Sequence, residues 1–279
     1  MAKVLMFHRV LPDKLITKPN AYSTYGTLIS QAYFEKVLSL LSENDFQFVT
    51  MSEISQHGDT DKVVALTFDD GYSDNFEFAL PSLQKFKATA TFFPVVSPCK
   101  DHSVLPLDIY YQCVDEMNST DIARTEYITG ETKRNFYWAE PDKQLALLST
   151  LFRKLPQKHR LSYMSAEELK KLSDHGFEIG SHGMTHSLLT ADYMTEGKAL
   201  YEMRESKQWL EEITGKQVTA YCFPAGRYNA SMIELAKNVG YTSTSLVFRK
   251  ENENEALPSY DRVFVRPNAF EELKAAMEI

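Results

Sequence analysis

Short runs of apolar residues recur along the chain, separated by longer amphipathic segments. Continuous apolar runs are typical of strands that are buried on both faces of a parallel sheet. Such runs occupy residues 3–7, 46–50, 62–68, 88–96, 177–181, 218–223, 241–248 and 262–267. The pattern therefore predicts seven or eight strands, most of them followed by a helix.

The amphipathic segments carry apolar residues three and four positions apart, which indicates helices. They occupy residues 30–45, 75–86, 165–176, 195–215 and 229–240, with a shorter helical start at 51–56. Ser30 is a suitable N-cap for the first of these helices, and Ser165 with Glu168 predicts a capping box for the third. We expect the second helix to be interrupted or entered at Pro81.

Regular periodicity weakens between residues 97 and 160, where prolines and aromatic residues are frequent. One clear helical segment covers residues 142–155. We interpret this stretch as an insertion with helices of its own, inside a single domain that spans residues 1–279. A short acidic segment at residues 251–261 is typical of a solvated loop.

Strands that alternate with helices along most of the chain predict a parallel sheet, and the number of strands favours a closed barrel. The expected fold class is therefore α/β, a TIM-like (β/α) barrel. In such barrels the functional side chains lie where strands end and loops begin. Polar residues at predicted strand ends are thus the first candidates for chemistry.

Two neighbouring acids, Asp69 and Asp70, follow directly after the apolar run 62–68. Two carboxylates in a partly buried place repel each other and raise each other's pKa, so we expect a cation nearby. Adjacent residues on a turn point in different directions, so one carboxylate can bind the cation while the other takes a proton from water. For either acid alone, the alternative role is the N-cap of the following helix.

A second polar group follows the apolar run 177–181. His182 and His186 are four residues apart, and Gly180 and Gly183 allow the backbone to bend tightly around them. Surface or capping histidines explain most such pairs, but this pair also lies at a predicted strand end. If both strands end on the same face of the barrel, the histidines and one aspartate form a three-ligand metal site with open positions for water and substrate.

Composition and charge narrow the classes of function. Hydrophobic residues make up 43% of the chain, enough for a sizeable core. The formal net charge of −8 argues against an extended nucleic-acid surface, which needs clustered Lys and Arg. Three widely spaced cysteines, Cys99, Cys113 and Cys222, suggest no disulfide framework and fit a reducing compartment.

The sequence contains no run of 18 or more apolar residues, the length that predicts a transmembrane helix. The first residues, MAKVLMFHRVLPDK, lack the longer apolar stretch and the small-residue cleavage site of a signal peptide. We therefore expect a cytoplasmic protein without a transmembrane segment, and the sequence makes no prediction of its oligomeric state.

The segments LTFDDGYSD and IGSHGMTH together resemble the first two motifs of the polysaccharide deacetylase family, also known as carbohydrate esterase family 4 or the NodB-homology domain. The resemblance extends from VLMFHRV through LPSLQKFKATATFF to YCFPAGRYN, and so covers most of the chain outside the insertion. It implies a distorted seven-stranded (β/α) barrel and a metal-dependent hydrolase that removes an acetyl group from a sugar. It also implies that Asp69 is the catalytic base and that Asp70, His182 and His186 are the metal ligands.

Three features depart from the family pattern. Gly183 stands where the second motif usually has Ser or Thr, and Cys222 stands where the third motif usually has an arginine. No histidine follows His186, so the late histidine that serves the family as general acid is absent. The chain is more similar to members with an N-terminal Tyr-His-x-Val strand and a late Arg-hydrophobic-x-Val element, which correspond here to FHRV and DRVFV.

That similarity implies His8 as the general acid, and His8 also lies at a predicted strand end. A purely structural histidine is the alternative. The similarity further implies that Arg262 steadies Asp69, although Arg227 and Arg266 compete for this role. Arg227 lies one residue past a loop glycine, so contact with the substrate is an alternative role for it.

The third motif of the family also supplies a backbone N–H to the oxyanion, and this N–H corresponds here to that of Ala225. Four aromatic residues of the insertion, Tyr110, Tyr111, Tyr137 and Trp138, are candidates for a sugar-binding platform. A plain role in the core is the alternative for each of them.

The resemblance implies a function in removing the acetyl group from an N-acetylated sugar, in particular a surface-polysaccharide or glycan precursor. The expected cofactor is a divalent metal ion: Zn²⁺ suits nitrogen and oxygen ligands, and Co²⁺, Ni²⁺ or Mn²⁺ are alternatives. The expected partner is the acetylated sugar or oligosaccharide itself. Two other functions stay open, namely an amidase of the same mechanism on a non-sugar amide and a sugar-binding protein without catalytic activity.

Overall fold

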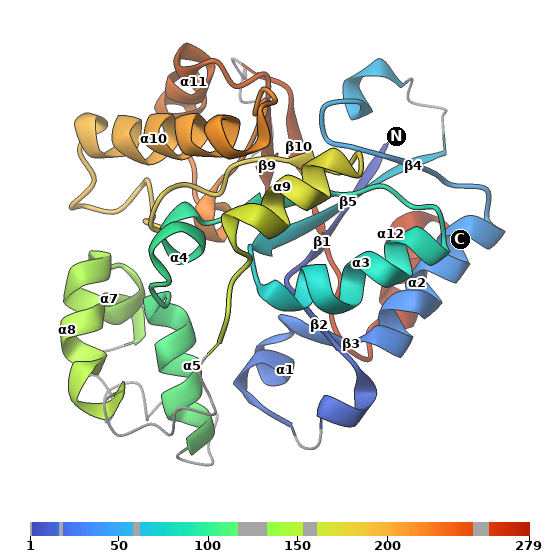
Figure 1. The fold of residues 1–279 in the computed structure, drawn as a ribbon, viewed down its shortest axis with the longest axis horizontal. Coiled ribbons are helices and arrows are strands. Elements are labelled where there is room, and N and C mark those ends of the chain that lie inside the picture. Colours follow the sequence, from blue (N-terminus) through green and yellow to red (C-terminus); the bar gives the residue numbers. More distant parts are fainter. Residues whose placement is uncertain (1, 17–18, 58–61, 117–132, 153–160, 248–256) are drawn as a thin grey trace.

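The computed structural model describes residues 2–16, 19–57, 62–116, 133–152, 161–247 and 257–279 (Figure 1). Its strands are β1 (Lys3–Phe7), β2 (Arg9–Leu11), β3 (Leu28–Ser30), β4 (Gln47–Val49), β5 (Val63–Asp70), β6 (Thr91–Pro94), β7 (Glu178–Ile179), β8 (Ala220–Cys222), β9 (Ser243–Leu246), β10 (Ser259–Asp261) and β11 (Val263–Phe264). The long strand β5 is buried over its whole length, as its apolar run predicts.

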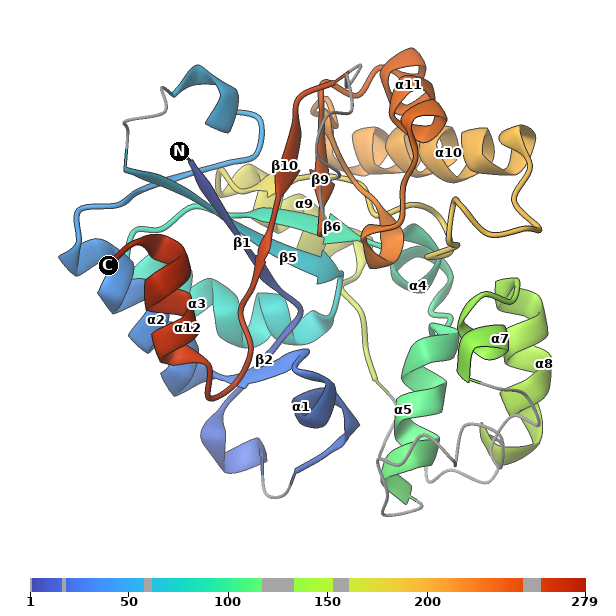
Figure 2. The same ribbon diagram turned by 180° about the vertical axis from the view of Figure 1, so that it is seen from behind.

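The barrel is built from two groups of parallel strands. One group has the order β11, β1, β5, β6, β7, with β4 also paired to β5, and the other has the order β10, β9, β8. Figure 2 shows β1, β5 and β6 of the first group together with β9 and β10 of the second. Hydrogen bonds join them, because Ser181 N–H, just after β7, donates to Ala220 O and Ser181 O accepts from Cys222 N–H. On the other side, β10 and β11 are consecutive through Arg262. Strands β1, β5, β6, β7, β8, β9 and β10–β11 thus close the distorted seven-stranded barrel, and the predicted α/β fold class is confirmed.

The register of the strands decides which side chains meet at the edge. Phe7 of β1 pairs with Phe68 of β5, so His8 and Asp69 are the next residues along two neighbouring strands. Asp70 in turn pairs with Pro94 at the end of β6. The ladder is parallel throughout, and its carboxyl-terminal edge therefore carries His8, Asp69 and Asp70 together.

Helices flank the strands and build the insertion. They are η1 (Asp13–Leu15), α1 (Ala21–Tyr25), α2 (Gln31–Glu43), η2 (Ile54–Gln56), η3 (Asn75–Ala79), α3 (Leu80–Lys85), α4 (Val96–Asp101), α5 (Pro106–Glu116), α7 (Lys133–Tyr137), α8 (Pro141–Phe152), α9 (Ala166–Asp174), α10 (Glu196–Thr214), η5 (Pro224–Gly226), α11 (Ala230–Val239) and α12 (Phe270–Met277). The predicted caps are confirmed: Ser30 accepts from Tyr33 N–H at the start of α2, and Ser165 and Glu168 form a capping box on α9. The helix predicted at 75–86 begins as the π-helical turn η3 and continues as α3, with Pro81 in its first turn.

The hydrophobic core contains a stack of aromatic rings across the central strands. Phe7, Phe68 and Phe92, from β1, β5 and β6, lie with ring centroids 5.2 and 5.0 Å apart along the stack. All three side chains are fully buried. This stack holds the three strands whose ends carry the polar edge described above.

The insertion has helices of its own, as predicted, and they pack around a separate hydrophobic cluster. Figure 1 shows α5, α7 and α8 grouped to one side of the barrel strands. The cluster joins Tyr110 and Phe136 of the insertion to Ala21, Tyr22 and Leu28 of α1 and β3. The insertion is thus packed on residues from near the start of the chain, while the single-domain organisation of residues 1–279 stays a prediction.

The pattern of apolar residues does not predict some helices and strands, because they are short or depend on pairing with a distant segment. The pattern does not predict α1, β2, β3, α5 or α12. The prediction of a loop over 251–261 is wrong at its end, where Ser259–Asp261 forms β10 by pairing with β9. Residues 251–256 of that loop, and residues 153–155 of the helix predicted at 142–155, lie outside the described residues.

Candidate metal centre and active site

The two predicted motifs meet at the carboxyl-terminal edge of the barrel. β5 ends on Asp69 and Asp70, and the segment from His182 to His186, here called the HGMTH loop, follows β7. Because the ladders from β5 through β6 to β7 are parallel, both segments leave the sheet on the same side.

Backbone hydrogen bonds fasten the HGMTH loop to the end of β6. His182 N–H donates to Pro94 O at 3.1 Å, and Val96 N–H donates to Gly183 O at 3.0 Å. Since β6 is the direct neighbour of β5, this attachment brings the loop alongside the two acids.

Asp70, His182 and His186 form a group of three ligand atoms that lie within 4.8 Å of one another. Asp70 Oδ1 is 3.6 Å from Nε2 of each histidine. The other ring nitrogen of His182, Nδ1, lies 2.8 Å from Cys222 O, which orients Nε2 toward Asp70. The three predicted metal ligands are therefore brought together by the fold.

The backbone at this group is held in a sparsely populated conformation. Asp70 has φ of 71° and His186 has φ of 62°, both in the left-handed region that residues with a Cβ seldom adopt. Such conformations cost on the order of 1–3 kcal/mol each and are concentrated at functional sites. The strain is consistent with a turn shaped to aim side chains.

The protonation behaviour of Asp70, His182 and His186 favours a cation between them. Burial and the neighbouring charge of Asp69 raise the pKa of Asp70 well above its ordinary value. Burial and the nearby His182 lower the pKa of His186 to about 3, and burial also lowers the pKa of His182. Two neutral imidazoles and a carboxyl group that needs a positive neighbour fit a divalent metal ion.

Asp69 has a different partner. Arg262, between β10 and β11, donates from Nη1 to Asp69 Oδ1 at 2.6 Å and from Nη2 to Oδ2 at 2.8 Å. Arg262 is itself held by Thr67 Oγ1 and Leu246 O, each at 3.3 Å. Burial alone would raise the pKa of Asp69, but the charge and hydrogen bonds of Arg262, together with His182 and His8, hold that pKa well below its usual range. Asp69 therefore stays ionised beside the metal group.

The two other arginine candidates lie elsewhere. Arg266 pairs with Glu272 at 2.7 Å on the surface. Arg227 is exposed and lies over the ring of Trp138, 5.7 Å from its centroid. Among the three candidates it is therefore Arg262 that contacts Asp69.

A second group of metal-ligand type, Asp69, His182 and Cys222, also lies within 4.8 Å. Both oxygens of Asp69 are occupied by Arg262, whose positive charge opposes a cation there. Burial raises the pKa of the Cys222 thiol well above its ordinary value, so the sulfur is protonated and lies 3.8 Å from both Asp69 oxygens. This group therefore fits a metal ion poorly, and Cys222 serves as a small neighbour of Asp69.

His8 lies at the end of β1, on the same edge. Its ring packs edge-on against Phe264 with centroids 5.4 Å apart, and its Nδ1 is buried without a hydrogen-bond partner among the described residues. Burial lowers the pKa of His8 to about 4, against the opposing effect of the Asp69 charge. The imidazole is thus neutral near pH 7 and has a ring nitrogen free.

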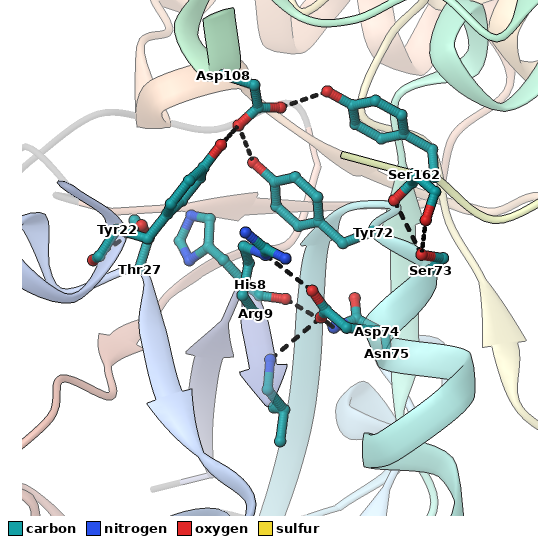
Figure 3. Close-up of polar contacts among 12 residues, drawn as sticks. His8, Arg9, Tyr22, Thr27, Tyr72, Ser73, Asp74, Asn75, Asp108 and Ser162 are labelled. Atoms are coloured by element: carbon teal, nitrogen blue, oxygen red, sulfur yellow. Dashed lines mark hydrogen bonds and ion pairs between the residues drawn. The ribbon is translucent and has the colours of Figure 1, made fainter. Parts of the chain in front are cut away.

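The backbone around His8 is held by the last residue of the first motif, Asp74, and by the residue after it, Asn75 (Figure 3). Asn75 Nδ2 donates to His8 O at 2.7 Å. Asp74 accepts from Val10 N–H at 3.2 Å and from Arg9 Nε at 2.8 Å. The segment that carries Asp69 therefore also positions the strand that carries His8.

A buried carboxyl group of the insertion lies above this network (Figure 3). Tyr22 and Tyr72 each donate a hydroxyl hydrogen bond of 2.8 Å to Asp108 Oδ1, and Tyr163 donates to Asp108 Oδ2. Arg9 lies between the rings of Tyr22 and Tyr72, 4.7 and 5.2 Å from their centroids. We call Asp108 and its three tyrosine partners the tyrosine junction. Because Tyr72 follows the DDG turn, this junction attaches the insertion to the segment that carries Asp70, one of the three residues of the metal group.

A pocket of about 100 Å³ opens beside the metal group. His186 and Ala225 line it on the barrel side, and Tyr137 is among its lining residues from the insertion. A wider groove of about 470 Å³ shares Thr185 and Tyr193 with it and continues between α8 and α10. Ala225 is exposed and has φ of 52°, at the turn η5.

The four aromatic candidates for a sugar platform separate into two pairs. Tyr110 and Tyr111 are buried in the hydrophobic cluster of the insertion, so they serve the core. Tyr137 lines the pocket beside His186, and Trp138 is partly exposed against Arg227. The second pair is the one placed to meet a ligand.

Sequence reasoning did not identify Asp74, Asn75 or Asp108 as parts of this region. For Asp74 and Asn75 a signal exists, because they lie within or next to the motif LTFDDGYSD and are polar at the start of an otherwise apolar helix. For Asp108 the sequence offers no such signal, since its three partners come from distant segments.

The geometry agrees with comparisons to known proteins. Residues 56–244 match the family model described as polysaccharide deacetylase. The chain belongs to the polysaccharide deacetylase family. The matched residues include both acids and both histidines of the site.

Individual relatives support the same family. The chain is 24% identical over 243 residues to "Putative polysaccharide deacetylase YxkH" of Bacillus subtilis (strain 168). The match covers 85% of this chain and 61% of that relative, so the chain spans less than two thirds of the relative's length.

Two solved structures share the fold. One is the Streptococcus pyogenes deacetylase PplD in complex with acetate, with a TM-score of 0.65 and 19% identity, covering 100% of this chain and 98% of that one. The other is the polysaccharide deacetylase BC0361 from Bacillus cereus, with a TM-score of 0.66 and 21% identity, covering 99% of this chain and 68% of that one. In the part of the chain that the structure describes, no helix has the length and hydrophobicity to cross a membrane.

Proposed function

We propose that this protein is a metal-dependent hydrolase that removes the acetyl group from an N-acetylated sugar. The observation that carries the proposal is the convergence of Asp70, His182 and His186, with Asp69 beside them and bonded to Arg262. Membership of the polysaccharide deacetylase family supports the class of reaction. A protein that only binds sugars would have no use for the additional buried acid, Asp69.

Asp70, His182 and His186 are the residues that would hold the metal ion. A divalent cation held there, with Zn²⁺ as our first choice, would lower the pKa of water and polarise the amide carbonyl of the substrate. Asp69 accepts the proton of the attacking water, because Arg262 keeps its carboxylate ionised and oriented.

His8 delivers a proton to the amide nitrogen as the C–N bond breaks, which releases acetate and a free amine. Since burial lowers the pKa of His8 to about 4, His8 holds no extra proton near pH 7 before the reaction. The proton that Asp69 has taken from water is therefore the one that His8 passes on. His8 and Asp69 follow the paired residues Phe7 and Phe68 on the neighbouring strands β1 and β5, and this placement supports the relay.

We assign the substrate side of the site to the turn after β8 and to the insertion. The backbone N–H of Ala225 is the proposed donor to the oxyanion, because Ala225 lines the same pocket as His186. Arg227 and Trp138, which lie against each other, are proposed to contact the sugar.

The proposed substrate is an acetylated sugar or oligosaccharide that serves as a precursor of a surface polysaccharide or another glycan. We propose a cytoplasmic location for this reaction. The cysteines Cys99, Cys113 and Cys222 are free and buried, which is usual in reducing compartments.

The test is acetate release by the protein supplied with Zn²⁺ or Co²⁺, from acetylated chito-oligosaccharides and from nucleotide-linked acetamido sugars. Asp69→Asn is expected to keep cobalt binding and lose acetate release, whereas Asp70→Asn is expected to lose both. The exposed Asp174→Asn serves as the control and keeps both. Full activity in both site variants, or no release from any acetylated sugar by the loaded protein, would overturn the proposal.

A further inference from the structure

The HGMTH loop has a glycine at its second position, and the structure gives a steric reason for it. Gly183 has φ of +85°, a conformation that disfavours any residue with a Cβ. A Cβ added at Gly183 would also lie only 2.9 Å from Oε2 of Glu202. The side chain that fills the space beside the loop is therefore a carboxylate from helix α10.

Glu202 makes three hydrogen bonds to the stretch between the two histidines. Its Oε2 accepts from Met184 N–H at 2.8 Å and from Thr185 N–H at 2.9 Å, and its Oε1 accepts from the Thr185 hydroxyl at 2.6 Å. The Thr185 hydroxyl lies 2.7 Å from that of Ser187. Both carboxylate oxygens are thus used to hold the residues that separate His182 from His186.

Burying the carboxylate of Glu202 costs enough free energy that a purely incidental position is a poor explanation for this residue. Glu202 is 5% exposed, and burial raises its pKa, while its bonds to Thr185 and Met184 lower it. A buried carboxylate is stable only when its oxygens are satisfied by donors, and here the backbone of one short loop supplies most of them. The loop N–H groups would in turn be left unsatisfied without Glu202.

We propose that Glu202 is a positioning residue for the metal centre, which holds the HGMTH loop in the shape that points His182 and His186 at one ion. The inference rests on the metal site of the proposed function, although it concerns metal binding and not turnover. Groups that orient metal ligands without touching the metal change metal affinity by about 10–100-fold when they are removed. We expect an effect of that size here.

The test is titration of the metal-free protein with Co²⁺, followed by visible absorption, which reports both affinity and coordination geometry. Glu202→Ala and the shorter Glu202→Asp are expected to weaken Co²⁺ binding by about 10-fold or more and to change the spectrum. Glu202→Gln is expected to bind within about three-fold of the parent, because its carbonyl oxygen can still accept both loop N–H bonds and the Thr185 hydroxyl can turn to accept.

A matched control comes from the strand that leads into the same loop. Glu178 of β7 accepts from the Thr91 hydroxyl at 2.7 Å and from Ser52 N–H at 3.2 Å, so its bonds go to other segments than the HGMTH loop. Glu178→Ala is expected to lower the melting temperature and leave the Co²⁺ affinity and spectrum unchanged. If Glu202→Ala and Glu202→Asp are folded at the temperature of the titration and bind Co²⁺ like the parent, the proposal is wrong.

The contact with Gly183 allows a second test. Gly183→Ala is expected to weaken Co²⁺ binding, and to weaken it less when Glu202 is already alanine, because the close approach to Oε2 is then gone. Strictly additive effects of the two substitutions would contradict the proposal. A parent protein that binds no Co²⁺ at all would instead overturn the metal centre itself, so the two failures are distinguishable.

Discussion

Arg262 binds the carboxylate of Asp69 with two hydrogen bonds, of 2.6 and 2.8 Å, although the two residues lie 193 positions apart in the chain. Asp69 and Arg262 are only 2% and 5% exposed. The contact is thus a buried bidentate ion pair, in which geometry matters as much as charge. The segment between β10 and β11 supplies this partner of Asp69, and the thiol of Cys222, in β8, lies 3.8 Å from the same carboxylate.

Replacing Arg262 by lysine keeps a positive charge and removes the two-bond geometry. We expect Arg262→Lys to lower kcat/KM on the order of 100-fold through misplacement of Asp69. The acid limb of the pH profile should move to higher pH, because the pKa of Asp69 rises when the guanidinium no longer holds it down. Acetate release measured between pH 4 and 9 checks both effects.

The control for this substitution is Arg266→Lys, since Arg266 forms a single exposed ion pair with Glu272. It should behave like the parent. An unchanged acid limb in Arg262→Lys would show that Arg262 does not set the protonation of the base.

The second prediction concerns stability in acid. In the folded protein the pKa of His8 is lowered from 6.5 to about 4, so between these pH values the unfolded chain binds more protons than the folded one. The free energy of unfolding should therefore fall as the pH falls from 6.5 to 4, at up to about 1.4 kcal/mol per pH unit for one such group. His8→Gln should make this slope shallower.

Urea unfolding in the presence of a chelator at pH 5 and pH 7 measures the slope. His102→Gln, at an exposed position, is the control and should keep the slope of the parent. Equal slopes in the parent and in His8→Gln would mean that His8 is not buried in its neutral form.

The third prediction concerns the support of His8. Asn75 donates to the backbone carbonyl of His8 at 2.7 Å, so Asn75→Ala should release that strand end. We expect stability to fall by about 1–3 kcal/mol and kcat to fall more than KM changes. The affinity for Co²⁺ should stay the same, because the Asn75 amide donates to His8 O and Asp74 and not to the proposed metal ligands.

Asn44→Ala is a matched control, because Asn44 also donates a side-chain amide bond of 2.8 Å to a backbone carbonyl, that of Leu40, on α2. It should lose stability and keep kcat. If Asn75→Ala keeps the kcat of the parent, Asn75 has only a structural role.

The fourth prediction concerns the tyrosine junction. Asp108→Ala removes the acceptor of the Tyr22, Tyr72 and Tyr163 hydroxyls, and we expect it to lower the free energy of unfolding by at least about 2 kcal/mol. Urea unfolding measures the loss. The exposed Asp142→Ala, in the same insertion, should have the stability of the parent. A loss no larger than that of Asp142→Ala would mean that the junction contributes little to holding the insertion.

Much of the candidate site follows from local sequence. Asp69 and Asp70 come directly after an apolar run, and His182 and His186 come directly after another, so a parallel barrel must place them at one edge. Strands β5 and β6 were predictable because each is buried over its whole length. The resemblance to the family then assigned roles within this edge.

The remaining parts depend on contacts that no local pattern encodes. The choice of Arg262 over Arg227 and Arg266 is decided by barrel closure, which brings β10–β11 beside β9 and β1. β10 has no apolar run and exists only because β9 offers it a pairing edge. Glu202 looks like an ordinary acid on an amphipathic helix until the fold places it under the HGMTH loop.

The shared core of α1 and the insertion limits how this protein can be re-engineered. Ala21, Tyr22 and Leu28 bury their side chains against Tyr110 and Phe136, which lie more than eighty residues further along the chain. Excising the insertion to obtain a minimal catalyst would expose apolar side chains of the first thirty residues. It would also remove Asp108, the hydrogen-bond acceptor of the Tyr72 hydroxyl, two residues after Asp70. Chimeras with other members of the family should therefore exchange the two segments as a pair.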